Sequence, residues 1–128
     1  MFFSIHHIAI ICSNYEISKH FYSEILGFKI IRETYRSERK SYKLDLVLSG
    51  QIQLELFSFE NPPPRSSRPE ACGLRHLAFA VNNIRDVVSY LEKKNIQCEP
   101  IRIDENTGKR YTFFKDPDNL PLELYELI

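Results

Sequence analysis

The chain has 128 residues, which is the length of one ordinary domain or of two small modules that share a core. Its 17 Lys and Arg residues balance its 17 Asp and Glu residues, and this net charge of zero argues against nucleic-acid binding, which needs a basic excess. Hydrophobic residues make up 43% of the sequence, enough to bury a core, yet no run approaches the roughly 18 consecutive apolar residues of a membrane span.

The first half of the sequence reads as a strand, a helix and three further strands. An isoleucine-rich strand is expected over 5–12, and Ser13 with Glu16 then forms a capping box. Ile17, Phe21 and Ile25 recur at helical spacing up to Gly27, a natural helix stop. Strands are expected over residues 28–35, 44–49 and 51–59.

The second half repeats this order after a proline-rich loop. A strand is expected over 75–81, Asn83 is a candidate helix N-cap, and an apolar stripe follows from 84 to 91. Three more strands are expected over 96–103, 109–115 and 120–127, and Pro100 places the first of them at an edge or a bulge. The sequence therefore predicts an α+β fold in which two βαβββ modules, about 1–60 and 74–128, are joined by a linker at 61–73.

Each half carries one histidine and one glutamate in matching places. His7 opens HIAIICSN and His76 opens HLAFAVNN, 69 residues later. Glu55 lies in QLELF and Glu123 in PLELY, 68 residues later. A repeat that duplicates two metal-binding residue types at one register is hard to explain by packing alone.

Alternation along the strands predicts which side chains share a face. Each glutamate lies between two leucines and should point away from them. His7 shares its face with Ala9 and Ile11, and His76 with Ala78 and Ala80, and the small residues beside the histidines leave room for a ligand. His6, next to His7, should point to the opposite face and is not expected to be a ligand. A single glutamate on an alternating strand is ordinarily solvated, and a histidine that opens a strand is ordinarily structural, so the metal hypothesis depends on the coincidence of all four.

Two imidazoles and two carboxylates suit a borderline divalent ion. The site hypothesis is therefore that one such ion is bound by His7, Glu55, His76 and Glu123. Zn²⁺ or Ni²⁺ is favoured, and Fe²⁺, Co²⁺ or Mn²⁺ is the alternative.

The chain also resembles the vicinal oxygen chelate superfamily, which includes glyoxalase I, bleomycin-resistance proteins and extradiol dioxygenases. The resemblance spans almost the full length and rests on HHIAI, FYSEILGF, QLELF, GLRHLAFAV and FFKDPDNLPLELYE. It implies one domain over 1–128, in which the paired βαβββ modules form a cupped mixed sheet around a metal. The four ligand positions fall on His7, Glu55, His76 and Glu123.

This H-E-H-E set is most similar to that of bacterial glyoxalase I. The resemblance implies a metal-dependent lyase or isomerase that moves a proton next to a metal-chelated carbonyl of a small α-hydroxycarbonyl compound. A thiol adduct is one candidate for this compound. Glu123 would be the catalytic base, and Glu55 the second ligand or partner acid. The alternatives are a small-molecule binding or resistance protein without catalysis, and an Fe²⁺-dependent dioxygenase. A homodimer is also implied.

At one substrate-binding position, the sequence differs from bacterial glyoxalase I. Bacterial glyoxalase I carries an arginine in its first strand that holds the glutathione carboxylate, and Ile11 occupies that position here. Another anion would need another cation, and six residues are candidates: Arg36, Arg39, Arg65, Arg68, Lys109 and Arg110. The expected substrate-binding residues are Phe57, Tyr111, Phe113 and Arg36.

The thiols and the first residues bear on location. Cys12, Cys72 and Cys98 are an odd number without CxxC spacing, which argues against a disulfide scaffold. The segment MFFSIHHIAII has no basic region and is interrupted by histidines, so it is not expected to be an export signal. A cytoplasmic protein with a small-molecule partner, and with neither nucleic acid nor a membrane as partner, is expected.

Overall fold

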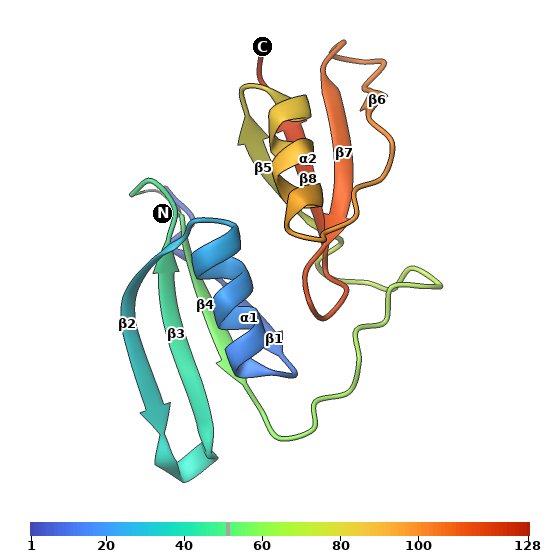
Figure 1. The fold of residues 1–128 in the computed structure, drawn as a ribbon. Coiled ribbons are helices and arrows are strands. Elements are labelled where there is room, and N and C mark those ends of the chain that lie inside the picture. Colours follow the sequence, from blue (N-terminus) through green and yellow to red (C-terminus); the bar gives the residue numbers. More distant parts are fainter. Residues whose placement is uncertain (51) are drawn as a thin grey trace. The chain divides into compact units, whose positions relative to one another are not determined.

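The structure is a computed structural model that describes residues 1–50 and 52–128, and it consists of two compact units, Met1–Pro64 and Arg65–Ile128. Each unit contains a strand, a helix and three further strands in that order (Figure 1). Each also has its own four-stranded mixed sheet, so the predicted α+β fold of two βαβββ modules is confirmed. Within the described residues, no helix has the length and apolar character needed to span a membrane.

The sheet of the first unit has the strand order β1-β4-β3-β2. β1 runs parallel to β4, and the other neighbours are antiparallel. The strands are β1 (His7–Cys12), β2 (Lys29–Arg36), β3 (Ser41–Val47) and β4 (Gln53–Ser58), and a short 3₁₀ turn, η2 (Ser37–Arg39), joins β2 to β3. The helix α1 (Tyr15–His20) continues into a π-helical turn, η1 (Phe21–Ile25).

The core of the first unit lies between the sheet and α1 (Figure 1). Leu44 and Leu46 of β3 and Leu54 and Leu56 of β4 are buried there. On the helix, the buried face is made by Tyr15, Ser18 and Tyr22 at helical spacing, whereas Ile17 is 55% exposed. One face of the sheet thus packs against the helix, and the opposite face lies outside this core.

The helix α1 begins one residue later than the sequence predicts. The N-cap is Asn14, whose Oδ1 accepts a hydrogen bond from the backbone N–H of Ile17 at 3.2 Å, so the predicted capping box with Ser13 at the N-cap is wrong. Asparagine is among the best N-cap residues, and a cap at 14 moves Glu16 out of the position that a capping box requires. The predicted stop is correct, since Gly27 has a left-handed φ of 83° immediately after the helical segment.

The sheet of the second unit has the corresponding strand order, β5-β8-β7-β6, with β5 parallel to β8. The elements are β5 (Leu77–Val81), the helix α2 (Ile84–Lys93), β6 (Arg102–Ile103), β7 (Arg110–Lys115) and β8 (Pro121–Glu126). The predicted strand over 96–103 is reduced to the two residues of β6, although it lies at the predicted edge. Pro100 has no N–H for a ladder, and the Thr112 hydroxyl donates instead to the carbonyl of Glu99 at 2.6 Å.

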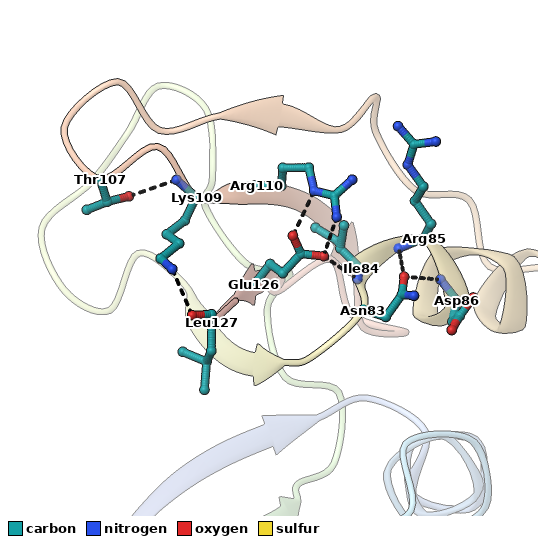
Figure 2. Close-up of polar contacts among 9 residues, drawn as sticks. All are labelled: Asn83, Ile84, Arg85, Asp86, Thr107, Lys109, Arg110, Glu126 and Leu127. Carbon is teal, nitrogen blue, oxygen red and sulfur yellow. Dashed lines mark hydrogen bonds and ion pairs between the residues drawn. The ribbon is translucent and has the colours of Figure 1, made fainter.

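A buried carboxylate joins the helix of the second unit to its sheet (Figure 2). Glu126 follows Leu122 and Leu124 on the core face of β8 and is buried like them. It accepts the backbone N–H of Ile84 at 2.8 Å, at the first turn of α2, and hydrogen bonds from Arg110 at 2.7 and 2.9 Å. These bonds tie the start of α2 to β7 and β8.

The carboxylate of Glu126 should make stability depend on acid pH. The hydrogen bonds from Arg110 and from the Ile84 N–H hold its pKa below the ordinary value. A lowered folded-state pKa contributes stability that is complete above the unfolded pKa of about 4.3 and is lost as the pH falls through the folded pKa. We expect Glu126→Gln to lower the Tm at pH 7 and to weaken the fall of the Tm below pH ~4.3.

Thermal unfolding followed by circular dichroism from pH 3 to 7 measures both effects, with Glu92→Gln on the exposed side of α2 as the control. Parallel pH profiles for wild type and Glu126→Gln would contradict this role.

Candidate metal centre

In the first unit, His7 and Glu55 lie together on the sheet face opposite the core. His7 opens β1, and the parallel register pairs it with Gln53 and pairs Ala9 with Glu55. The Nε2 atom of His7 is 3.6 Å from Oε1 of Glu55. The strand pairing therefore brings together two residues that are 48 positions apart in the sequence.

In the second unit, His76 and Glu123 form the same arrangement. His76 directly precedes β5, and Glu123 of β8 pairs with Ala78 in the parallel register. The Nε2 atom of His76 is 3.0 Å from Oε2 of Glu123. The imidazole also stands edge-on against Phe113, with ring centres 5.2 Å apart, and its Nδ1 is buried without a hydrogen-bond partner among the described residues.

The predicted alternation around both glutamates is confirmed. Leu54 and Leu56 are buried in the core of the first unit, and Leu122 and Leu124 in that of the second, which leaves both glutamates on the opposite face. Glu55 is nevertheless only 6% exposed, so its carboxylate is not an ordinary solvated surface group.

The two glutamates differ in their other contacts. Oε1 of Glu55 is 3.7 Å from Nζ of Lys43, and its Oε2 accepts a hydrogen bond from the Gln53 amide at 3.5 Å. Glu123 has His76 as its only ion-pair or hydrogen-bond partner within the part of the chain that the structure describes. Glu55 is thus fixed from several sides, whereas Glu123 is left freer.

Sequence reasoning missed the charged neighbours of Glu55. Lys43 and Asp45 lie beside it on β3, and Asp45 is fully buried with Nζ of Lys43 at 3.4 Å and Nε of Arg32 at 3.2 Å. The signal was present, because the alternation that buries Leu44 and Leu46 places Lys43 and Asp45 on the Glu55 face.

The prediction that His6 points away from His7 is wrong. The two Nδ1 atoms are 2.9 Å apart and the rings meet edge-on. Strand alternation does not apply to His6 because β1 begins only at His7. Around metal-binding histidines, a hydrogen bond to the ring nitrogen that does not bind the metal orients the ring.

The donor atoms in each pair fit a shared divalent ion. With metal–ligand bonds of about 2.0–2.2 Å, two donors on one tetrahedral or octahedral ion lie roughly 2.8–3.6 Å apart. The two pairs, at 3.6 and 3.0 Å, fall in this range, and imidazole nitrogen with carboxylate oxygen is a suitable donor set. Across residues 1–50 and 52–128, each unit supplies a pair, and no group of three or more His, Cys, Asp or Glu side chains forms a metal site.

Comparison with known proteins identifies the family. The model of the Glyoxalase/Bleomycin resistance protein/Dioxygenase superfamily matches residues 4–124. The chain belongs to this superfamily. Among its relatives, the chain is 65% identical over 123 residues to the uncharacterized protein YwkD of Bacillus subtilis (strain 168), with 96% of each chain covered. It is 61% identical over 122 residues to the uncharacterized protein YaeR of Escherichia coli (strain K12), with 95% of each covered.

Solved structures of the superfamily share the fold. The glyoxalase family protein from Enterococcus faecalis superposes with a TM-score of 0.90 and is 53% identical, with 96% of this chain and 97% of that one covered. Similarity of fold alone extends to lactoylglutathione lyase from Agrobacterium tumefaciens, at 18% identity and a TM-score of 0.72. It also extends to the fosfomycin resistance protein FosX from Listeria monocytogenes, at 17% and 0.76. The superfamily fold thus carries several activities and does not by itself select one.

The residues expected to contact substrate lie on the faces that carry the His–Glu pairs. Phe57 follows Glu55 on β4, and Phe113 pairs with Glu123 across β7 and β8. Tyr111 lies one step further along β7, edge-on to Phe113. In the first unit, the guanidinium of Arg36 stacks over Phe57. Each His–Glu pair of this superfamily member is therefore bordered by aromatic side chains.

Proposed function

We propose that this protein is a metal-dependent lyase or isomerase of the glyoxalase I-like type, acting on a small α-hydroxycarbonyl compound. The ligands of its single divalent ion are His7, Glu55, His76 and Glu123, with Zn²⁺ or Ni²⁺ favoured. Members of the superfamily generally bind a divalent metal. The observation that carries the proposal is the recurrence of one His–Glu pair, at metal-compatible spacing, on the non-core face of both sheets.

The alternative to a metal site is that both His–Glu pairs are ion pairs that only stabilise the fold. Such a pair would serve packing, yet in each unit the core lies on the opposite face of the sheet. Along its own strand, each histidine is followed on the same face by an exposed alanine, Ala9 after His7 and Ala78 after His76. This small-residue border is what access for a ligand requires.

Glu123 is the proposed catalytic base and Glu55 the fixed ligand or partner acid. A base that takes a proton from carbon and returns it to a neighbouring carbon has to move, and Glu123 is held by His76 alone among the described residues. Glu55 is restrained by His7, Lys43 and Gln53. The aromatic side chains beside each pair would exclude water from the reacting atoms.

The bound ion would supply Lewis acidity, which stabilises the negative charge that develops on carbonyl and hydroxyl oxygens when the proton leaves carbon. The protein would provide the orientation of the two oxygens and the proton carrier.

The activity test follows proton exchange rather than one chosen product. Metal-loaded protein is incubated in D₂O with dihydroxyacetone, hydroxypyruvate and the thiol adducts of methylglyoxal, and deuterium at the carbon next to the carbonyl is followed by NMR. We expect Glu123→Gln to reduce exchange by roughly 10²–10⁴-fold. Glu92→Gln, on the exposed side of α2, should leave it unchanged.

Two outcomes would count against the lyase or isomerase, and a third would count only against the assigned base. Binding of the compounds without exchange would favour a binding or resistance protein. Oxygen consumption with Fe²⁺ would favour a dioxygenase. Full exchange by Glu123→Gln would remove Glu123 from the role of base while leaving the reaction class intact.

Two further properties are part of the proposal. Superfamily proteins often form dimers, and we propose a homodimer here. Among the described residues, Cys12, Cys72 and Cys98 form no disulfide bond, which fits the reducing environment of a cytoplasm.

A further inference from the structure

The Glu55 face of the first unit carries three basic side chains in different charge environments. Arg32 has Nε at 3.2 Å from Oδ2 of Asp45. Lys43 has Nζ at 3.4 Å from Oδ1 of Asp45 and at 3.7 Å from Oε1 of Glu55. Arg36 has no carboxylate partner among the described residues, so its positive charge is not neutralised locally.

The guanidinium of Arg36 is held in place by aromatic rings and a hydroxyl group, none of which neutralises its charge. Its carbon lies 4.7 Å from the ring centre of Phe57 and 5.7 Å from that of Phe59. Its Nε and Nη2 donate to the hydroxyl of Ser41 at 3.1 and 2.6 Å, and Nη1 makes no hydrogen bond to a described residue. A guanidinium that is stacked and fixed on one edge is preorganised to bind an anion through its other edge.

The position of Arg36 relative to the proposed chemistry is defined by β4. Phe57, on which Arg36 stacks, follows Glu55 by two residues on the same face, a step of about 6.6 Å along the strand. That step is comparable with the length of a three-carbon compound. A small substrate whose oxygens lie near Glu55 could therefore place its far end at Arg36.

Of the other five basic candidates, three make contacts elsewhere and two are exposed. Arg65 donates to the carbonyls of Leu74 and Arg75, and Arg110 is paired with Glu126. Lys109 donates to the carbonyl of Leu127. Arg39 and Arg68 are exposed, Arg39 in the η2 turn and Arg68 in the segment between β4 and β5.

The second unit provides a matched comparison. Arg102 stacks over Tyr111 at 5.1 Å and over Phe113 at 5.8 Å, much as Arg36 stacks in the first unit. Its Nη2, however, lies 3.2 Å from Oε1 of Glu99. Both arginines have aromatic support, and only Arg36 retains an uncompensated charge.

We propose that Arg36 is a specificity-determining residue that binds an anionic group, a carboxylate or a phosphate, at the end of the substrate remote from the reacting carbons. As a statement about substrate, this rests on the proposed function. It narrows the class from α-hydroxycarbonyl compounds in general to those with an anionic end group.

The test measures how tightly the protein binds three compounds that share one three-carbon skeleton. Dihydroxyacetone is neutral, hydroxypyruvate replaces one end with a carboxylate, and dihydroxyacetone phosphate adds a phosphate. Dissociation constants are measured by NMR titration, with chelated metal-free protein and again with metal-loaded protein. We expect wild type to bind at least one anionic probe roughly 10–100-fold more tightly than dihydroxyacetone, the gain typical of a charged hydrogen bond. Whichever of the two anionic probes binds more tightly shows whether the site recognises a carboxylate or a phosphate.

The variants assign that preference to one residue. Arg36→Gln should abolish it, Arg36→Lys should retain part of it, and Arg102→Gln should retain all of it. Equal or undetectable binding of the three probes by wild type would overturn the proposal, as would loss of the preference in Arg102→Gln. If Arg36→Gln does not fold, resonance shifts of the Arg36 Nε–H in wild type decide: a shift specific to the anionic probes supports the site, and no shift overturns it.

The metal-free arm separates this proposal from the proposed function. An Arg36-dependent preference in a protein that binds no metal would keep the anion site and remove the lyase or isomerase. Metal binding and proton exchange without any preference for the anionic probes would keep the lyase or isomerase and remove the anion site.

Discussion

Replacing His76 by alanine is expected to lower the affinity for Zn²⁺ or Ni²⁺ by at least about 100-fold. Loss of an outer partner of a metal ligand already costs about 10–100-fold, and His76 is proposed to be a ligand itself. The same loss is expected for His7→Ala, because the two histidines are proposed to bind one ion. Isothermal titration of metal-free protein with each ion measures the effect.

The other two histidines serve as controls. His20 lies in the last turn of α1, away from both pairs in sequence, and His20→Ala should bind metal like wild type. His6→Ala should cause a smaller loss than His7→Ala, because His6 contacts the Nδ1 of His7 and is not proposed to be a ligand. Unchanged affinity in both His7→Ala and His76→Ala would remove these residues from the metal site.

The replacement Leu122→Ala is expected to destabilise the protein by about 2–5 kcal/mol, the cost of emptying a well-packed leucine site. Leu122 is 0% exposed and lies on the core face of β8. The neighbouring Glu123 lies on the other face, and its carboxylate is proposed to serve catalysis rather than packing. Glu123→Gln should therefore leave the stability unchanged or raise it, as is common where a functional group is removed.

Urea unfolding of the metal-free protein measures this contrast without interference from metal binding. Leu127→Ala is the control for the leucine change, since Leu127 is 56% exposed at the end of the same segment. A loss of several kcal/mol in Glu123→Gln would mean that the His76–Glu123 pair is a structural ion pair, and the catalytic role of Glu123 would then lack support.

The sheet faces could be predicted from the sequence because burial on one side imposes a period of two. The patterns Leu54-Glu55-Leu56 and Leu122-Glu123-Leu124 leave one arrangement for each glutamate, and the structure has that arrangement. A one-residue slip of register in either strand would have exposed both of its leucines, so the pattern fixes the faces strongly. The repeat then extended the prediction from one unit to the other.

Competing local interactions account for the errors. Ser13 and Asn14 are both good N-caps, and in the structure it is Asn14 that accepts the N–H three residues further on, that of Ile17. The strand over 96–103 was predicted from its apolar residues, but a ladder needs donors, and Pro100 supplies none. His6 was assigned by an alternation that begins one residue later.

Charge pairing was the hardest feature to predict. The sequence offered six basic residues for an anion, and only the tertiary contacts separate Arg36 from Arg110, which is paired with Glu126. Glu126 was itself missed as a core residue. The alternation along the strand places Glu126 on the same face as Leu122 and Leu124. A carboxylate on a core face is tolerated only with partners such as Arg110, however, and the sequence pattern does not reveal such partners.

The number of ions bound per chain tests the central claim most directly. Metal-free protein is titrated with Zn²⁺ and with Ni²⁺, and the stoichiometry is read from calorimetry and from elemental analysis after dialysis. If the two His–Glu pairs act on one ion, wild type binds one ion per chain, whether the pairs belong to one chain or to two chains of a dimer. Two ions per chain would mean that each pair is a separate weak site, and no bound ion would mean that the pairs are not metal ligands. Either of these results would contradict the shared metal centre.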